Sequence, residues 1–135
     1  MPSVLLDRVL QVYEALNRDD LDSIVPYVHP HVEWHTGGLL PQLEPVEHGV
    51  EGMRRWWSAV KEPWESFGIG LERHLEAENT VTTWIAFDAV AAGSGVEVAL
   101  GLAHVFEFEG GQIRRHRTYV CFEEAMRNVR AAATR

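Results

Sequence analysis

Residues 97–113 read EVALGLAHVFEFEGGQI, and this stretch decides the fold class. Apolar residues occupy every second position, and the positions between them hold mostly small or charged residues. A period of two is typical of a β-strand with one buried face, and a pair of glycines favours a tight turn into the next strand. The face that we expect to be buried carries Val98, Leu100, Leu102, His104, Phe106 and Phe108.

The same reading extends over the second half of the chain. Apolar alternation predicts strands at 69–75, 81–91 and 113–122, separated by turns at 78–79, 92–95 and 110–111. Residues 123–133 then close the chain as a helix. A run of consecutive strands joined by short turns indicates an antiparallel sheet.

The first half has helical periodicity instead. The pattern predicts a helix over 3–17 capped by Ser3, a short second helix capped by Asp20 that ends near residue 28, and a strand over 31–36. A loop over 37–47 leads to a third helix from Val50 to Val60, with an extension to Trp64 left open. Helices segregated from a run of strands indicate an α+β fold, and 135 residues without a linker fit one domain over 1–135.

Composition excludes several classes of function. The net charge is −8, and the basic clusters Arg54–Arg55 and Arg114–Arg117 are short, so we expect salt-bridged faces and no nucleic-acid partner. No apolar run approaches membrane-spanning length, and we expect neither a signal peptide nor a membrane partner. A single cysteine, Cys121, suits a reducing compartment, and we expect a cytoplasmic protein.

Four short motifs, in order along the chain, resemble those of one known family. They are LNRDDLD at 16–22, HPHVEWH at 29–35, HGVEGM at 48–53 and GGQI at 110–113 followed by Tyr119. Together they resemble the SnoaL-like and ketosteroid isomerase-like members of the nuclear transport factor 2-like superfamily. The resemblance implies a cone-shaped α+β fold, in which a curved, mainly antiparallel sheet wraps around helices and encloses an internal pocket. That fold hosts isomerases, cyclases, hydrolases, dehydratases and non-enzymatic domains, so it does not fix the activity.

The residues that ketosteroid isomerases use are missing at the matching positions. Those enzymes carry a tyrosine, an aspartate base and a protonated aspartate. An ungapped comparison places Val12 at the tyrosine position, with Tyr13 one residue away, Thr36 at the base and His104 at the second aspartate. We therefore expect no ketosteroid isomerisation by that mechanism. The comparison implies a pocket lined by Val12, Trp34, Thr36, Trp57, Thr118 and Val120, with His116 facing it.

His104 and His116 are the candidate catalytic residues. Alternation places His104 on the buried face, where an imidazole needs hydrogen-bond partners. It is either a satisfied core histidine or a pocket donor or base. His116 either joins it, with both rings kept neutral by burial so that one accepts a proton and the other donates a hydrogen bond, or lies on a wet edge among arginines.

A second histidine cluster at 29–35 raises the question of a metal. His29, His31, Glu33 and His35 share one face of an extended strand, but neighbours on that face are roughly 6.6–6.8 Å apart. Adjacent residues could not both reach an ion at about 2.0–2.2 Å unless the strand bent. We therefore expect a polar, solvent-facing edge, with no metal and no other cofactor.

The outer face of the sheet is expected to be apolar and to join two copies of the chain. Trp84 lies on that face together with Ala86, Ala99, Gly101, Ala103 and Val105. A flat apolar surface is typical of an interaction site, which predicts a homodimer.

Two functions remain open from the sequence. The first is a cofactor-independent isomerase, cyclase or hydratase that acts on a small, mostly apolar organic compound through His104 and His116. The second is a non-catalytic ligand-binding or protein-assembly domain of the same fold.

Overall fold

The computed structural model describes residues 3–36 and 40–120, and within them it forms three helical segments and one six-stranded sheet. The helices are α1 (Val4–Asn17), the 3-10 helix η1 (Leu21–Tyr27) and α2 (Gly49–Lys61). The strands are β1 (Val28–His35), β2 (Val46–His48), β3 (Trp64–Ala77), β4 (Thr80–Ala91), β5 (Glu97–Glu109) and β6 (Gln112–Tyr119). The helix expected over 123–133 and Cys121 lie outside the described residues. None of the helices described is long and apolar enough to cross a membrane.

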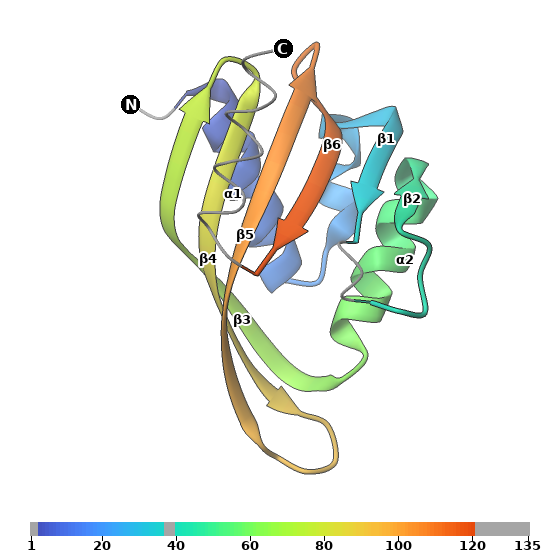
Figure 1. The fold of residues 1–135 in the computed structure, drawn as a ribbon, viewed down its shortest axis with the longest axis vertical. Coiled ribbons are helices and arrows are strands. Elements are labelled where there is room, and N and C mark those ends of the chain that lie inside the picture. The colour runs from blue at the N-terminus through green and yellow to red at the C-terminus, as the bar shows by residue number, and fades with distance from the viewer. Residues whose placement is uncertain (1–2, 37–39, 121–135) are drawn as a thin grey trace.

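The sheet has the order β2-β1-β6-β5-β4-β3, and only the β1–β6 pair is parallel. Helix α1 lies behind β3, β4 and β5, and α2 lies beside β1 and β2 (Figure 1). Both helices contribute to the same hydrophobic core. The curved sheet therefore wraps around its helices, which confirms the expected α+β fold.

The helix boundaries follow from a few local interactions. The Ser3 hydroxyl caps α1, as expected, by accepting the Leu6 N–H at 3.0 Å. Asp20 precedes η1 but its side chain makes no cap; its backbone carbonyl accepts hydrogen bonds from Ser23 instead. Pro26 inside η1 has no N–H to donate, so the segment remains a short 3-10 turn.

Two predicted elements are corrected. Trp64 does not extend the third helix: α2 ends at Lys61, and Trp64 begins β3 opposite Ala91. Pro63 accounts for this, because it cannot supply the N–H that another helical turn needs. The expected loop over 37–47 ends earlier than predicted: residues 46–48 form the edge strand β2, which pairs with the end of β1.

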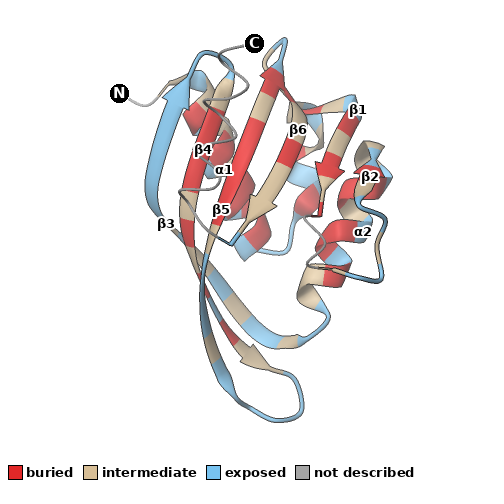
Figure 2. Cartoon of the chain, viewed as in Figure 1, coloured by how far each residue is buried: buried red, intermediate tan, exposed pale blue. Residues whose placement is uncertain are grey.

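The core lies between the helices and the inner face of the sheet. Figure 2 shows buried residues concentrated on the central strands and on both helices, while β3 and the tip of the β4–β5 hairpin are exposed. The predicted buried face of β5 is confirmed at His104, Phe106 and Phe108. Leu100 is 43% exposed, because it lies toward the hairpin end that extends past the helices (Figure 1).

The outer face of the sheet is less open than its sequence suggests. Ala103 and Val105 are buried within one chain, where they form a small cluster with Trp84 and Tyr119. The indole of Trp84 lies across the neighbouring strand, so close to Gly101 that an added Cβ would meet its Cζ2 atom at 2.9 Å. Small residues on β5 therefore make room for Trp84, and the expectation that this whole row is exposed is wrong.

Asn17, the last residue of α1, attaches the helix to the sheet. Its side-chain Nδ2 donates to the Ile69 carbonyl at 2.9 Å, and its Oδ1 accepts the Ile69 N–H at 2.7 Å. The amide thus pairs with β3 in the way that a strand residue would. This double contact fixes where the C-terminal end of α1 lies on the sheet.

Replacing Asn17 with alanine should therefore lower the free energy of unfolding by about 1–2 kcal/mol, the value of two partly exposed hydrogen bonds. Urea denaturation measures the change. Gln11→Ala is the matched control, because Gln11 donates a hydrogen bond to Asp7 within the same helix. Equal stability of the two variants would show that the contact with β3 contributes nothing.

Candidate functional site

A cavity of about 450 Å³ opens between the two α-helices and the inner face of β3 to β6. Tryptophans from α2 and β3 form much of its wall, and aliphatic and aromatic residues of β3, β4 and β5 complete it. Its polar side chains, among the described residues, come from Thr36, His104 and Thr118. The apolar lining consists of Leu16, Leu40, Trp56, Trp57, Ala59, Val60, Pro63, Trp64, Ile69, Ile85, Phe87, Leu100, Gly101, Leu102 and Val120.

His104 lies on β5 and connects the cavity wall to helix α1. The Tyr13 hydroxyl is 2.8 Å from His104 Nδ1 and 2.6 Å from the Thr83 hydroxyl. All three side chains are buried. Burial lowers the pKa of His104 to about 3 and raises the pKa of Tyr13, so both groups are neutral near pH 7.

His116 lies on β6 next to His104, but it does not line the cavity. Its ring is stacked on Trp34, with centroids 4.2 Å apart, and its centroid is 4.6 Å from that of His104. It is fully buried, and neither ring nitrogen has a hydrogen-bond partner among the described residues. Burial, and to a lesser degree the proximity of His104 and His35, holds the pKa of His116 well below its usual value.

A family model for the SnoaL-like domain matches residues 9–116, which include nearly all of this site. The chain belongs to the SnoaL-like family. No match was found among curated proteins.

Solved structures with the same fold resemble the SnoaL-like domain over most of its length. An NTF2-like protein of unknown function from Burkholderia pseudomallei is 22% identical over 93% of this chain and 97% of its own, with a TM-score of 0.79. TerC, co-crystallised with polyporic acid, is 17% identical over 93% of this chain and 97% of its own, with a TM-score of 0.77. A putative SnoaL-like polyketide cyclase from Jannaschia is 14% identical over 91% and 89%, with a TM-score of 0.76. At these identities the likeness shows the fold.

The SnoaL-like domain brings together only some of the residues that its sequence indicated. Thr36, Trp57, Thr118 and Val120 line the cavity with His104. The other three do not line it: Val12, Trp34 and His116 are buried in the packing around it.

Tyr13 is the main residue that the sequence comparison missed. The ungapped alignment selected Val12, but the tyrosine one position later reaches the candidate histidine. Its spacing was the available signal: Tyr13 follows Leu6 by seven residues and Val9 by four, so the three share one face of α1. Thr83 was missed as well, because a threonine inside an apolar strand has no distinctive pattern.

The two cavity threonines differ in how their hydroxyl groups are bonded. Thr36 Oγ1 donates to backbone carbonyls of the 44–45 segment at 3.3 and 3.4 Å. Thr118 Oγ1 is buried without a partner among the described residues. Thr118 also lies directly opposite His104 in the β5–β6 pair. The unpaired Thr118 hydroxyl and the His104 side chain therefore come from neighbouring positions on the same face of the sheet.

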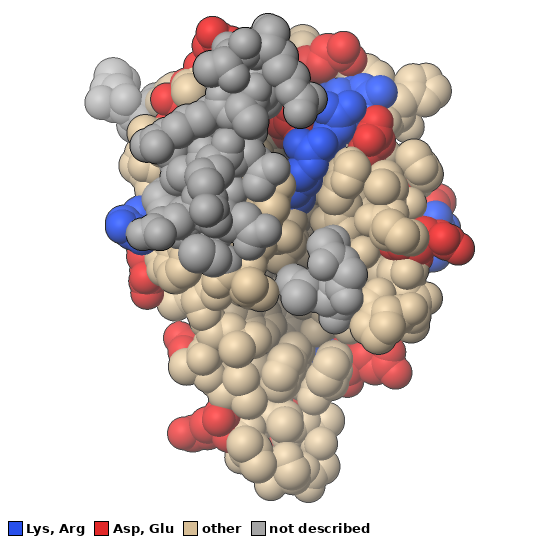
Figure 3. Space-filling model, viewed as in Figure 1, with Lys and Arg blue, Asp and Glu red and all other residues tan. Residues whose placement is uncertain are grey.

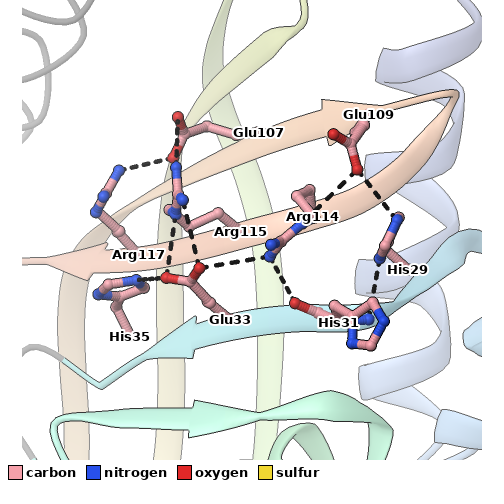
Figure 4. Close-up of polar contacts among 9 residues, drawn as sticks. All are labelled: His29, His31, Glu33, His35, Glu107, Glu109, Arg114, Arg115 and Arg117. Atoms are coloured by element: carbon pink, nitrogen blue, oxygen red, sulfur yellow. Dashed lines mark hydrogen bonds and ion pairs between the residues drawn. The ribbon is translucent and has the colours of Figure 1, made fainter.

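The histidine cluster at 29–35 belongs to a network of ion pairs on the outer face (Figure 4). Glu33 pairs with Arg114, Arg115 and His35, and hydrogen bonding to Arg115 lowers its pKa to about 2. His29 pairs with Glu109. Figure 3 shows the basic side chains gathered on this face with acidic ones beside them. The expected salt-bridged face is confirmed for these arginines, and the described residues contain no group of three side chains that could hold a metal.

Acid should destabilise the SnoaL-like domain below pH 6.5. The folded state keeps His104 and His116 neutral, whereas the unfolded chain protonates both near pH 6.5. The unfolded state therefore binds more protons as the pH falls, and each histidine lowers the free energy of unfolding by about 1.4 kcal/mol in total between pH 7.5 and 5.5. Urea denaturation between pH 7.5 and 5.5 measures this slope.

His116→Phe separates the contribution of that residue, because His35 and His104 titrate in both proteins. Between pH 6.5 and 5.5 the variant should lose less of its free energy of unfolding than the wild type does. Glu33 does not interfere, since the stability it contributes is lost only as the pH falls from 4.5 toward 2. Identical slopes would mean that His116 takes up a proton in the folded state as readily as in the unfolded chain.

Proposed function

We propose that the protein binds a small, uncharged, mostly apolar organic compound in this cavity, and that His104 is the polar group that contacts it. One observation carries the proposal: an apolar cavity of about 450 Å³ has a buried, neutral histidine in its wall. Small-molecule sites are concave and mostly apolar, with a few polar groups that orient the ligand. The cavity of this chain fits that description.

The lining favours an uncharged ligand. None of the described lining residues carries a charge near pH 7, so a buried ion would lose its hydration without gaining a counter-charge. The net charge of −8 further disfavours an anion. TerC, which has the same fold, was co-crystallised with polyporic acid, and this supports an organic compound as the class of ligand.

We further propose that the protein catalyses a cofactor-independent isomerisation, cyclisation or hydration of the bound compound. His104 is the group that acts on that compound. The putative polyketide cyclase of the same fold supports this class. A non-catalytic ligand-binding role is the second candidate. It is favoured by the fact that His104 is the sole titratable side chain among the described lining residues, while His116 lies behind it.

His104→Phe should weaken the binding of a carbonyl compound about tenfold or more, the effect of losing roughly 1.4 kcal/mol from one hydrogen bond, while the fold survives. The probe is α-tetralone, a bicyclic ketone, titrated into ¹⁵N-labelled protein and followed through the indole resonances of Trp56 and Trp57. A melting curve and an amide spectrum check the fold.

Tetralin, the same skeleton without the carbonyl, is the matched control. It should bind the wild type and His104→Phe equally, because it meets only the apolar wall. If neither compound perturbs the cavity resonances, the proposed site is wrong. If α-tetralone binds both proteins equally, His104 is only a core residue.

We also propose that the outer sheet face forms a homodimer. Ala99 and Gly101 are exposed there beside the half-buried Trp84, although Ala103 and Val105 are already covered within one chain. Sedimentation at micromolar concentration should give a dimer, and Ala99→Arg should shift it toward monomer. Glu65→Arg, an exposed position on the edge strand β3, is the control. A monomeric wild type would refute the proposal.

A further inference from the structure

A chain of three buried polar groups crosses from the sheet to helix α1. Thr83 on β4 and His104 on β5 are directly opposite each other in the sheet, and Tyr13 meets both from the helix. The Thr83 hydroxyl lies 2.6 Å from the Tyr13 hydroxyl, which lies 2.8 Å from His104 Nδ1. One of the two ring nitrogens is therefore already engaged, and the use of the other depends on where the hydrogens lie.

Two arrangements of the hydrogens satisfy the short contacts. In the first, Thr83 donates to the Tyr13 oxygen and Tyr13 donates to Nδ1. In the second, Nδ1–H donates to Tyr13 and Tyr13 donates to Thr83. The Thr83 hydroxyl is then left, among the described residues, with the His104 carbonyl as its acceptor, 3.5 Å away. That distance is at the limit of a hydrogen bond, whereas both bonds of the first arrangement are short.

The chemistry of the groups favours the first arrangement as well. A phenol is a better donor than a neutral imidazole N–H, and an imidazole nitrogen is a better acceptor than an alcohol oxygen. The neutral ring has one nitrogen that donates and one that accepts. When Nδ1 accepts from Tyr13, the proton of the ring must reside on Nε2.

We propose that Tyr13 and Thr83 are positioning residues that hold His104 as its Nε2–H tautomer, so that the cavity presents a hydrogen-bond donor and selects ligands with an acceptor such as a ketone or ester carbonyl. This inference rests on the proposed ligand-binding function. In this tautomer the ring has no free lone pair, so His104 does not act as a base. It stabilises partial negative charge on the ligand oxygen by donating a hydrogen bond.

Thr118 supports the location of this polar spot. Its hydroxyl is buried without a partner among the described residues. Thr118 lines the cavity and is paired with His104 in the β5–β6 register. A ligand carbonyl beside Nε2 would therefore lie close to a second polar group, whereas the rest of the described lining is almost entirely apolar. A hydrocarbon ligand would leave both groups unsatisfied, which costs free energy in a buried site.

The tautomer can be measured without any ligand. Long-range ¹H–¹⁵N correlation spectra of the ¹⁵N-labelled wild type at pH 7 distinguish a protonated from an unprotonated ring nitrogen. We expect His104 to have a bare Nδ1 and a protonated Nε2. In Tyr13→Phe the donor to Nδ1 is lost, and the ring should become a mixture of tautomers. Tyr27→Phe, which alters a half-buried tyrosine away from the cavity, should leave the spectrum of His104 unchanged.

The second arm compares the affinities of α-tetralone and tetralin. The wild type should prefer the ketone, and Tyr13→Phe should reduce that preference about threefold to tenfold without changing the affinity for tetralin. A steric change in the cavity would instead lower the affinity for both compounds. Thr83→Val tests the part played by Thr83: loss of its hydrogen bond to Tyr13 should admit a fraction of the other tautomer, smaller than in Tyr13→Phe. An unchanged His104 spectrum in Thr83→Val would overturn the role assigned to Thr83.

The outcomes separate this inference from the proposed function. A wild type with a protonated Nδ1 overturns the positioning role even if both probes bind. Equal affinity for the ketone and the hydrocarbon overturns the selection of an acceptor. Absence of binding by either probe overturns the proposed function and the selection together, while the tautomer still decides the role of Tyr13. Because the wild-type spectrum suffices for that decision, the test holds even if Tyr13→Phe does not fold.

Discussion

The hydrogen bond between the Tyr13 hydroxyl and His104 Nδ1 links helix α1 to the middle of the sheet at the wall of the cavity. A buried imidazole without a partner would cost free energy, and so would a buried phenol. Each group satisfies the other, and Thr83 completes the set from the neighbouring strand. The apolar cavity can include His104 at that point because His104 Nδ1 and the Tyr13 and Thr83 hydroxyls satisfy one another.

Around β6 the outer face of the sheet carries charged side chains and the inner face is uncharged, and the same strand contributes residues to both. On β6, Arg115 and Arg117 form ion pairs on the outer face, whereas His116 between them is fully buried. A shift of register by one residue would bring arginines into an environment without counter-charges. The pairs that Arg115 makes with Glu33 and Glu107 on the two neighbouring strands favour the correct register. The charged outer face thus helps to keep the inner face apolar.

The sequence predicted those parts of this structure that follow from a local pattern alone, such as a regular alternation of apolar residues or a helix cap. Alternation along residues 97–109 placed His104 on the inner face, and the serine at position 3 marked the start of the first helix. Tyr13 was not predicted, because residues 12 and 13 are both buried and an ungapped alignment cannot decide between adjacent helical positions. The burial of Ala103 and Val105 was not predicted either. It depends on where Trp84, from another strand, places its indole, and no local pattern contains that information.

The parallel pairing of β1 with β6 affects how the protein is made. These strands pair Val28 with Ile113 and Trp34 with His116, so the partner of an early strand is synthesised more than 80 residues later. Until β6 emerges, β1 and the β2 strand attached to it have no place in the sheet, and Trp34 has no imidazole to stack against. Long-range pairing of this kind carries a large loop-closure entropy and slows folding. During translation the β3–β4–β5 meander precedes β6, so Trp56 of α2 lacks its contact with His116 until the last strand is made.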